Sequence, residues 1–220
     1  MPETLERTTT RITAAVKPLS PEEQRSRDQD AEHRLRSVKA SKIEDLRSTW
    51  NAPKRHVDCK PKQYGEWVSM LDFLRAKLGG GFMVALVGGR GNGKTMMAVE
   101  LMKHVTDGLN SALYATSIEF FINIKRSYRL DSQIDEMDVI KRFRKPSFLV
   151  IDEIGKRGQS DWENNMLFEL LNKRYGDMTD TLLIDNIGKA EFIAAIGPSL
   201  ASRMQETGGI IEASWQSFRS

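Results

Sequence analysis

The chain has 220 residues, with 33 basic and 30 acidic side chains, a formal net charge of +3 and one cysteine, Cys59. This length allows one sizeable core plus an extension, and the near-balance of charge does not by itself indicate a nucleic-acid binder. No apolar run approaches the roughly 18–20 residues that span a bilayer, and residues 1–20 lack the apolar core of a secretory signal. A single cysteine can form neither an intrachain disulfide nor a zinc site. We therefore expect a cytoplasmic protein without membrane contact.

The first predicted element is a long helix that begins near Pro21 and runs into the region 43–50. Ser20 suits the N-cap, Pro21 the first helical position and Glu23 the third, which together form a capping box. Apolar residues are sparse on this charged rod and form one narrow stripe: Ala31, Leu35, Val38, Ile43, Leu46 and Trp50. Such a stripe makes no core alone. It requires a partner, which is either the rest of this chain or another protein.

Residues 51–62 contain two prolines and no periodicity, and they predict a linker. We therefore expect a helical N-terminal region with its linker over residues 1–62 and a second domain over residues 63–220. The first part carries 14 basic and 10 acidic side chains, and the second carries 19 and 20. Any DNA contact in the second domain must therefore come from local patches. That domain starts with an amphipathic helix, Tyr64–Leu78, which Gly79–Gly81 ends.

A phosphate-binding motif follows. The apolar run Phe82–Val87 predicts a buried strand, and the octet Gly88–Thr95 fits the P-loop pattern G-x-x-x-x-G-K-[ST]. A helical stretch continues from Met96. The order of strand, glycine loop and helix is the context that the motif requires, and the alternative is a glycine-rich turn that matches by chance.

The residue types of this loop suit a triphosphate. Glycines let backbone N–H groups approach the phosphates, and the N-terminal end of the following helix attracts an anion. Lys94 would reach the β- and γ-phosphates, and the Thr95 hydroxyl would bind Mg²⁺. The expected ATP contacts are Gly88, Gly89, Arg90, Gly91, Asn92, Gly93, Lys94, Thr95 and Met96.

The rest of the chain alternates apolar strands with helices, which indicates an α/β protein with a parallel sheet covered by helices on both faces. The further strands are expected at Ala112–Ala115, Phe148–Ile151, Thr181–Ile184 and Ile210–Ala213. The helices between them are expected at Ile118–Tyr128, Ile134–Arg144, Trp162–Tyr175, Lys189–Ile196 and Leu200–Gln205.

Polar residues end two of these strands. Asp152 and Glu153 follow Phe148–Ile151, at the edge where an open α/β sheet places its ligands. Asp152 would hold Mg²⁺, and Glu153 would polarise the water that attacks the γ-phosphate. Asn186 follows the next strand and would hydrogen-bond the γ-phosphate or that water. The alternative is that all three are ordinary strand-end residues.

These pieces resemble the AAA+ ATPases of the DnaC-type helicase loader family, close relatives of the IstB-type transposition ATPases. The resemblance covers about residues 63–220. The residues that carry it are Gly88–Thr95, Leu149–Gly155, Asn172–Tyr175, Thr181–Asn186, Gly197–Met204, Gly208–Gly209 and Trp215–Arg219.

The resemblance implies roles for further residues. It makes Arg203 an arginine finger that reaches the ATP site of a neighbouring subunit, and this implies a homo-oligomer or docking beside another ATPase. Because the chain stops soon after its last strand, we expect no C-terminal lid domain. The resemblance also places Asn186 in the position of the residue called sensor 1 in this family. Asp185 directly precedes it and brings a carboxylate close to the nucleotide unless its side chain points away.

The candidates for contact with DNA are local. In the resembled initiator-type ATPases, the helix after the second strand faces single-stranded DNA, and here that helix carries Lys125, Arg126 and Arg129. Aromatic residues, Phe120, Phe121 and Tyr128, are interleaved with them. Such a combination suits backbone neutralisation with base stacking. A solvated charged face with its aromatics in the core is an equal alternative.

The sequence thus predicts an ATP-dependent loader that uses ATP and Mg²⁺. Residues 1–62 would grip a replicative hexameric DNA helicase, and the AAA+ domain would bind single-stranded DNA and release the helicase onto it during replication initiation. The main alternative is an IstB-like transposition ATPase that assembles on double-stranded DNA. A small-molecule kinase would need an arginine-rich lid and an acceptor signature, and an adaptor with an idle site would not need Lys94, Thr95, Asp152 and Glu153 intact.

Overall fold

The structure is a computed structural model that describes residues 20–59 and 65–218. The chain divides into two compact units, Met1–Lys42 and Ile43–Ser220. This division lies some way before residue 62, where the composition had suggested a boundary.

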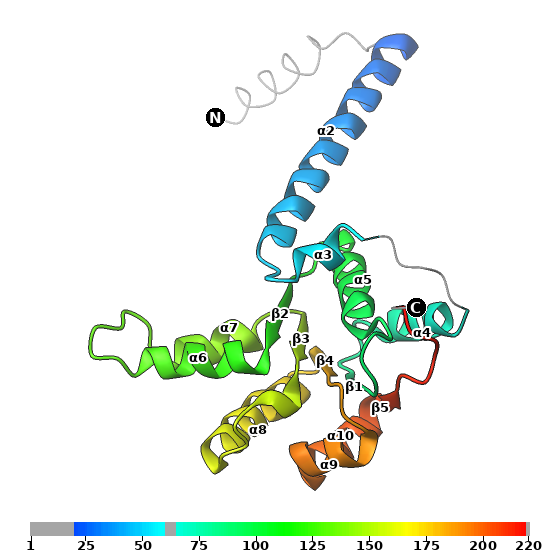
Figure 1. The fold of residues 1–220 in the computed structure, drawn as a ribbon. Coiled ribbons are helices and arrows are strands. Elements are labelled where there is room, and N and C mark those ends of the chain that lie inside the picture. Colours follow the sequence, from blue (N-terminus) through cyan, green and yellow to red (C-terminus); the bar gives the residue numbers. More distant parts are fainter. Residues whose placement is uncertain (1–19, 60–64, 219–220) are drawn as a thin grey trace, which may run out of the picture. The chain divides into compact units, whose positions relative to one another are not determined.

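The second unit is built on one parallel sheet of five strands (Figure 1). The strand order is β2-β3-β4-β1-β5, so the P-loop strand β1 lies between β4 and β5. The register pairs Ala85 with Leu183 on one side and with Ile210 on the other. The strand bounds are β1 Met83–Val87, β2 Ala112–Thr116, β3 Phe148–Asp152, β4 Asp180–Ile184 and β5 Gly209–Glu212. The predicted parallel α/β fold is confirmed.

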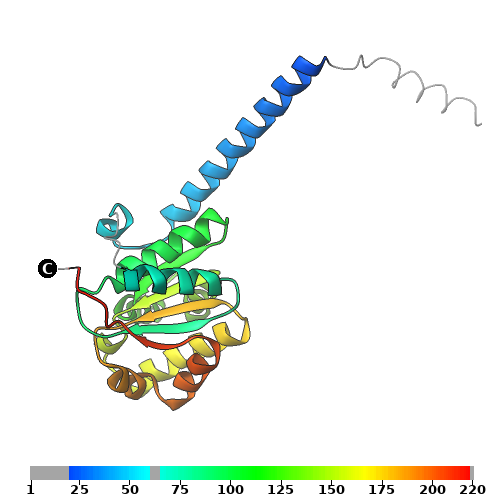
Figure 2. The ribbon, with the colours of Figure 1, turned by 90° about the vertical axis from the view of Figure 1, so that its right-hand side faces the viewer.

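Helices cover both faces of the sheet, as the sequence predicts (Figure 2). Along β1, Met83, Ala85 and Val87 face one apolar core and Val84 and Leu86 face the other. The first core takes residues from α6 Ser117–Ser127, α7 Glu136–Arg144, α8 Asp161–Gly176, α9 Lys189–Ile196 and α10 Pro198–Thr207. The second core takes residues from α4 Gly65–Lys77 and α5 Lys94–Asp107. Two hydrophobic layers therefore clamp the sheet that carries the motifs.

The long N-terminal helix is α2, Pro21–Ser48. Its capping box is present: the Glu23 N–H donates to Ser20 Oγ (3.2 Å), and the Ser20 N–H donates to the Glu23 carboxylate (2.8 Å). The helix itself buries none of its residues, and Leu35 and Val38 are 70% and 66% exposed. Residues 1–19 of the predicted N-terminal region lie outside the described residues.

The stretch after α2 differs from the linker that its prolines suggested. Trp50 is only 2% exposed and packs in the same core as α4 and α5. Its carbonyl accepts the Tyr114 N–H at 2.8 Å, and the Asn51 side chain donates to the Tyr114 carbonyl at 3.3 Å. A short helix, α3 Lys54–Val57, follows. These contacts hold the stretch against the edge strand β2, which is why the compact unit begins before residue 62.

Two short features complete the fold. α10 begins at Pro198, because proline suits the first turn of a helix, and it is longer than the predicted piece at 200–205. After β5, residues 213–218 form no helix or strand in the part of the chain that the structure describes.

Among residues 20–59 and 65–218, no helix combines the length and the apolar character needed to cross a membrane.

Arg174, on α8, connects the ends of several elements. It is fully buried, and its guanidinium donates to Thr181 Oγ1 (2.9 Å) and to four carbonyls, those of Phe143, Arg144, Pro146 and Asp180. An ammonium has three donors on one atom and cannot reach five acceptors. We expect Arg174→Lys to lower the free energy of unfolding by about 2 kcal/mol, measured by urea denaturation.

The matched control is Arg142→Lys, because Arg142 lies exposed on the neighbouring helix α7. The same chemical change there is expected to alter the free energy of unfolding by less than about 0.5 kcal/mol. Equal effects of the two substitutions would show that the network around Arg174 does not stabilise the fold.

Candidate functional site

The glycine loop between β1 and α5 has the backbone that its sequence requires. Gly93 has φ 72°, and a Cβ at this position would lie 2.9 Å from the Phe218 ring and 3.1 Å from the Trp67 indole nitrogen. Glycine is therefore needed both for conformation and for space. At the start of the loop, the Gly88 N–H donates to the Ile187 carbonyl at 2.8 Å, which ties the loop to the segment after β4.

Lys94 points into the loop. Its ammonium donates to the carbonyls of Gly88 (2.8 Å) and Gly89 (2.6 Å), and the residue is 4% exposed. Burial lowers the pKa of Lys94, and the nearby carboxylates of Asp152 and Asp185 oppose this shift. The Lys94 ammonium thus lies inside the glycine loop, at the place where a bound phosphate would contact it.

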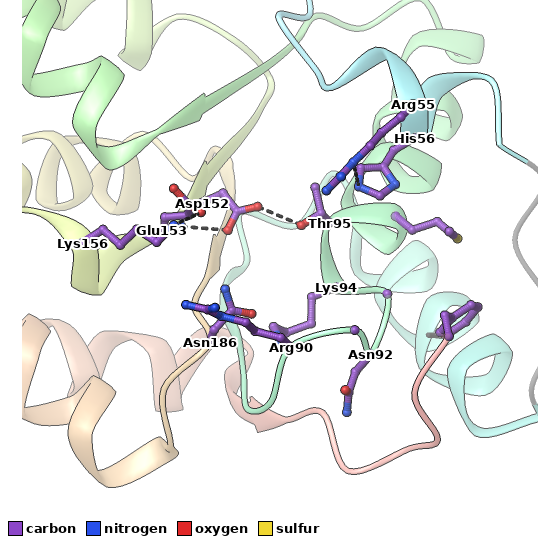
Figure 3. Close-up of a pocket in the computed structure, with 14 residues that line it drawn as sticks. Arg55, His56, Arg90, Asn92, Lys94, Thr95, Asp152, Glu153, Lys156 and Asn186 are labelled. Atoms are coloured by element: carbon purple, nitrogen blue, oxygen red, sulfur yellow. Dashed lines mark hydrogen bonds and ion pairs between the residues drawn. The ribbon is translucent and has the colours of Figure 1, made fainter. Parts of the chain in front are cut away.

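Asp152 lies at the carboxyl end of β3, beside the start of α5. One carboxylate oxygen accepts hydrogen bonds from Thr95 Oγ1 (2.9 Å) and the Tyr114 hydroxyl (2.7 Å), and the other accepts the Glu153 N–H (2.7 Å). Burial raises the pKa of Asp152, and burial together with the adjacent Asp152 raises the pKa of the Tyr114 phenol. Figure 3 shows the contact between Asp152 and Thr95.

This pair fits a magnesium ion by the chemistry of its donors. Magnesium prefers a few hard oxygen ligands and keeps water or phosphate oxygens in its other positions. A threonine hydroxyl and a carboxylate, within hydrogen-bond distance of each other, provide two such ligands. Within the described residues, no group of three or more His, Cys, Asp or Glu side chains could hold a metal ion without other ligands.

Glu153 has an unusual backbone. Its φ of 60° places a non-glycine residue in the left-handed region, a conformation that costs about 1–3 kcal/mol. The Ser117 hydroxyl donates to its carbonyl at 2.7 Å, which helps to fix the turn. The carboxylate forms an ion pair with Lys156 and lines the same cavity as Lys94. The residue predicted to act as the catalytic base therefore lines the cavity from a turn with a strained backbone.

Asn186 also lines this cavity, whereas the neighbouring Asp185 does not. The Asp185 carboxylate accepts the Asn186 N–H at 2.6 Å and also accepts the Gly155 N–H. Asp185 is 3% exposed. Its acid therefore points toward the turn after β3, which answers the question that its position in the sequence raised.

The cavity has a volume of about 450 Å³, in the usual range for a ligand site. Basic side chains at its rim suit a polyphosphate. Its lining residues are Arg55, His56, Arg90, Gly91, Asn92, Gly93, Lys94, Thr95, Met96, Asp152, Glu153, Lys156, Asn186 and Phe218. Figure 3 shows Arg90 and Asn186 on one side and Arg55 and His56 of α3 on another.

Four of these residues were missed by sequence reasoning: Arg55, His56, Lys156 and Phe218. The adjacent basic side chains of the supposed linker were the only sequence signal for the first two. Gly88 and Gly89, which were predicted to contact ATP, meet Lys94 through their carbonyls and are not among the residues that line the cavity.

Arg203 does not line this cavity. It lies on α10, where its guanidinium carbon is 5.5 Å from the ring centres of both Phe168 and Tyr175. One of its nitrogens donates to the Ser199 hydroxyl at 2.5 Å. The guanidinium is thus held between two aromatic rings, away from the nucleotide site of its own chain.

The three basic candidates for DNA contact are exposed on α6 or just after it. The Lys125 ammonium lies 3.6 Å from the Glu163 carboxylate and 5.5 Å from the Trp162 ring centre, and its side chain is still 61% exposed. Phe120 and Phe121 are 0% and 3% exposed, and their proposed stacking on bases is wrong because they fill the core. Tyr128 is 52% exposed, and Lys125, Arg126 and Arg129 remain candidates.

The comparison with protein families matches residues 6–204 to the IstB-like ATP binding protein model. Among characterised proteins, the replicative helicase loader DnaC of Buchnera aphidicola subsp. Baizongia pistaciae is 22% identical over 130 residues, which cover 59% of this chain and 53% of that protein. The DnaC of Escherichia coli K12 is 24% identical over 131 residues, with the same coverage. The chain thus matches about half the length of these relatives.

Solved structures give the same fold. The crystal structure of the DnaC helicase loader aligns with a TM-score of 0.62 at 18% identity, and covers 73% of this chain and 99% of that one. The structure of DnaI aligns at 0.58 and 16%, and covers 78% and 96%. AMPPCP-bound DnaA from Aquifex aeolicus aligns at 0.58 and 14%, and covers 73% and 50%.

Proposed function

The chain belongs to the IstB-like ATP binding protein family, and from this premise we propose that it is an ATP-dependent loader of a replicative DNA helicase. The observation that carries the ATPase part is the meeting of the P-loop with Asp152 and Glu153 in one cavity. The similarity to DnaC loaders supports the choice of the helicase as partner. We place the protein in the cytoplasm, where such a loader would act.

We assign the phosphates of ATP to the loop Gly88–Thr95, whose glycines place no side chain between the backbone and a bound phosphate. Lys94 would neutralise the β- and γ-phosphates, and Thr95 with Asp152 would hold Mg²⁺, which supplies charge neutralisation when bound. Glu153 would accept a proton from the attacking water, and Asn186 would orient that water or the γ-phosphate. The described carboxylates and amide face one cavity, which suits hydrolysis as well as binding.

For the neighbouring subunit, we propose that Arg203 acts in trans as an arginine finger. Its position outside the cavity of its own chain fits this role. The two rings that flank the guanidinium would hold it extended, so that less conformational freedom is lost when it meets a γ-phosphate. This proposal requires a homo-oligomer or a neighbouring ATPase.

We propose that the helicase binds the apolar stripe of α2. Leu35 and Val38 are large, exposed and one turn apart on a helix that buries none of its own residues. An amphipathic helix of this kind docks its apolar face into a groove of a partner. Single-stranded DNA would meet the exposed Arg126 and Arg129 of the second unit.

The stripe proposal predicts a loss of helicase binding. The double substitution Leu35→Glu with Val38→Glu places two charges in the proposed apolar interface, and we expect the dissociation constant for the helicase hexamer to rise at least about 10-fold. Binding is measured by titrating the labelled protein with the replicative helicase of its source. ATP turnover is expected to stay unchanged, because the nucleotide site lies in the other compact unit.

The charge-matched control is His33→Glu with Ser37→Glu, since both residues are exposed and lie on the opposite face of α2. This pair should leave helicase binding unaffected. If both double variants bind the helicase as tightly as the unaltered protein, the stripe is not the contact. If the unaltered protein binds no helicase, the loader function itself fails.

The family match also supports a second candidate, an IstB-like ATPase that assembles on double-stranded DNA for transposition. The two functions are separated by measuring, with ATP present, the fluorescence anisotropy of single- and double-stranded oligonucleotides of equal length. Preference for the single strand is expected of the loader, and cooperative assembly on the duplex is expected of the transposition ATPase.

A further inference from the structure

We propose that residues 213–218, which we call the C-terminal segment, position the P-loop for nucleotide binding through a clamp between Asn92 and Trp215. This inference deepens the proposed function, because it rests on the nucleotide site described above. It adds two positioning residues that the P-loop pattern does not specify, since the pattern leaves position 92 open to any residue.

The clamp is made of hydrogen bonds in both directions. The Asn92 side-chain amide donates to the carbonyls of Ala213 (2.7 Å) and Trp215 (3.1 Å). In return, the Trp215 indole N–H donates to the Asn92 carbonyl at 2.5 Å. Next to the clamp, the Phe218 N–H donates to the Gly91 carbonyl at 2.8 Å. The middle of the loop is therefore held by a segment more than a hundred residues away.

The C-terminal segment is itself anchored, so it can hold the loop in place. The Ala213 N–H donates to the Val87 carbonyl at the end of β1 (2.8 Å), and Trp215 is 5% exposed in the core beside α4 and α5. The Phe218 ring also packs edge-on against Trp67 of α4, with ring centres 5.6 Å apart. The clamp thus connects the P-loop to the packed core and not to a loose end.

The direction of the Asn92 side chain separates this role from phosphate binding. In Figure 3 the Asn92 amide points away from Thr95 and Asp152, toward the C-terminal segment. Its two amide hydrogens are directed at two carbonyls of that segment, which leaves no donor for a phosphate. Asn92 therefore acts on the nucleotide through the loop backbone.

The need for such a clamp follows from the composition of the loop. Gly88, Gly91 and Gly93 have φ values of 112°, 90° and 72°, and glycine is the residue that loses most backbone freedom when it is fixed. A loop that is not held must be ordered by the nucleotide, which weakens binding. Hydrogen bonds that fix the loop beforehand therefore raise the affinity for the phosphates.

The test is Trp215→Phe, which keeps an apolar ring and removes the indole N–H. We expect the dissociation constant for ATP to rise about 5- to 10-fold, measured with a fluorescent ATP analogue, and the constant for inorganic tripolyphosphate to rise by a similar factor. Asn92→Ala should weaken both ligands likewise. Because the two residues form one clamp, the double variant should bind only slightly more weakly than either single variant.

The matched control is Trp50→Phe. Trp50 lies in the same apolar core, but its indole nitrogen has no hydrogen-bond partner among the described residues. We expect this variant to keep the ATP affinity of the unaltered protein. The unfolding midpoint without nucleotide is measured for all variants, so that a loss of affinity can be told from a loss of folding.

The proposal is overturned if Trp215→Phe binds ATP and tripolyphosphate as the unaltered protein does. It is also overturned if Trp215→Phe lowers only the unfolding midpoint, since Trp215 would then be a packing residue. These outcomes leave the proposed function intact. Failure of the unaltered protein to bind ATP, or full binding by Lys94→Ala, would instead contradict the nucleotide site.

Discussion

Replacement of Lys94 by alanine is expected to abolish measurable ATP binding at micromolar ATP and to lower turnover at least about 100-fold. The ammonium lies 2.6–2.8 Å from two loop carbonyls and is the buried cation of the cavity. Without it, the described lining of the cavity keeps no buried cation to neutralise the triphosphate. Binding is measured by calorimetry and turnover by phosphate release.

Glu153→Gln provides the counterpart within the same site. It keeps the shape of the side chain but removes the base, so we expect normal ATP affinity and turnover lower by about 10²–10⁴-fold. The two variants together distinguish a binding residue from a catalytic one. A measurable loss of ATP affinity in Glu153→Gln would mean that the carboxylate serves the site through its ion pair with Lys156.

Lys141→Ala is the control for Lys94→Ala, because Lys141 is exposed on α7 and its ion pair in the described part of the chain is with Asp138, one helical turn away. It should alter neither binding nor turnover. If Lys94→Ala turned over ATP at the rate of the unaltered protein, the assignment of the nucleotide site would be wrong. The protein would then share the fold of these ATPases without hydrolysing ATP at this loop.

Arg203→Ala is expected to lower turnover by about 10³-fold while ATP affinity stays within a factor of a few. The reason is that the proposed finger stabilises charge that develops during transfer and contributes little to the bound ground state. Arg203→Lys should fail nearly as completely, because an ammonium cannot present the planar fork. Turnover is measured at a protein concentration where the oligomer is observed by sedimentation.

Mixing two inactive variants tests the action in trans. Lys94→Ala has a defective site and an intact finger, whereas Arg203→Ala has the reverse. In a mixed oligomer, the intact site of one subunit can meet the intact finger of the next, so turnover should be partly restored. If turnover is not restored in mixed oligomers, or if Arg203→Ala alone is fully active, Arg203 has no part in the mechanism.

A large part of the fold could be predicted because its signals are local. Short apolar runs bounded by glycine or acidic residues identify buried strands, and the spacing of the glycines predicts the conformation of the P-loop. The strands β1, β3 and β4 were found within a residue or so of their bounds. The site residues Lys94, Thr95, Asp152 and Glu153 lie together because the carboxyl ends of parallel strands meet at one edge of the sheet.

The tertiary structure alone decided the features that depend on residues far apart in the chain. Neither the short helix α3 nor its place at the cavity follows from the sequence, because prolines and isolated basic residues also describe a linker. The burial of Phe120 and Phe121 is equally hidden, since an aromatic residue on an amphipathic helix suits a core or a nucleic acid.

By itself, the sequence determined the succession of strands and helices along the chain, the phosphate loop, and which residues could bind a nucleotide and its magnesium ion. These follow from periodicity and from the conformational freedom of glycine, both of which act over a few residues. Only the tertiary structure decided that Asp185 turns away from the cavity and that Asn92 is held by Trp215. A hydrogen bond between distant residues has no signature in either local sequence, because its geometry exists only after the sheet has brought the two segments together.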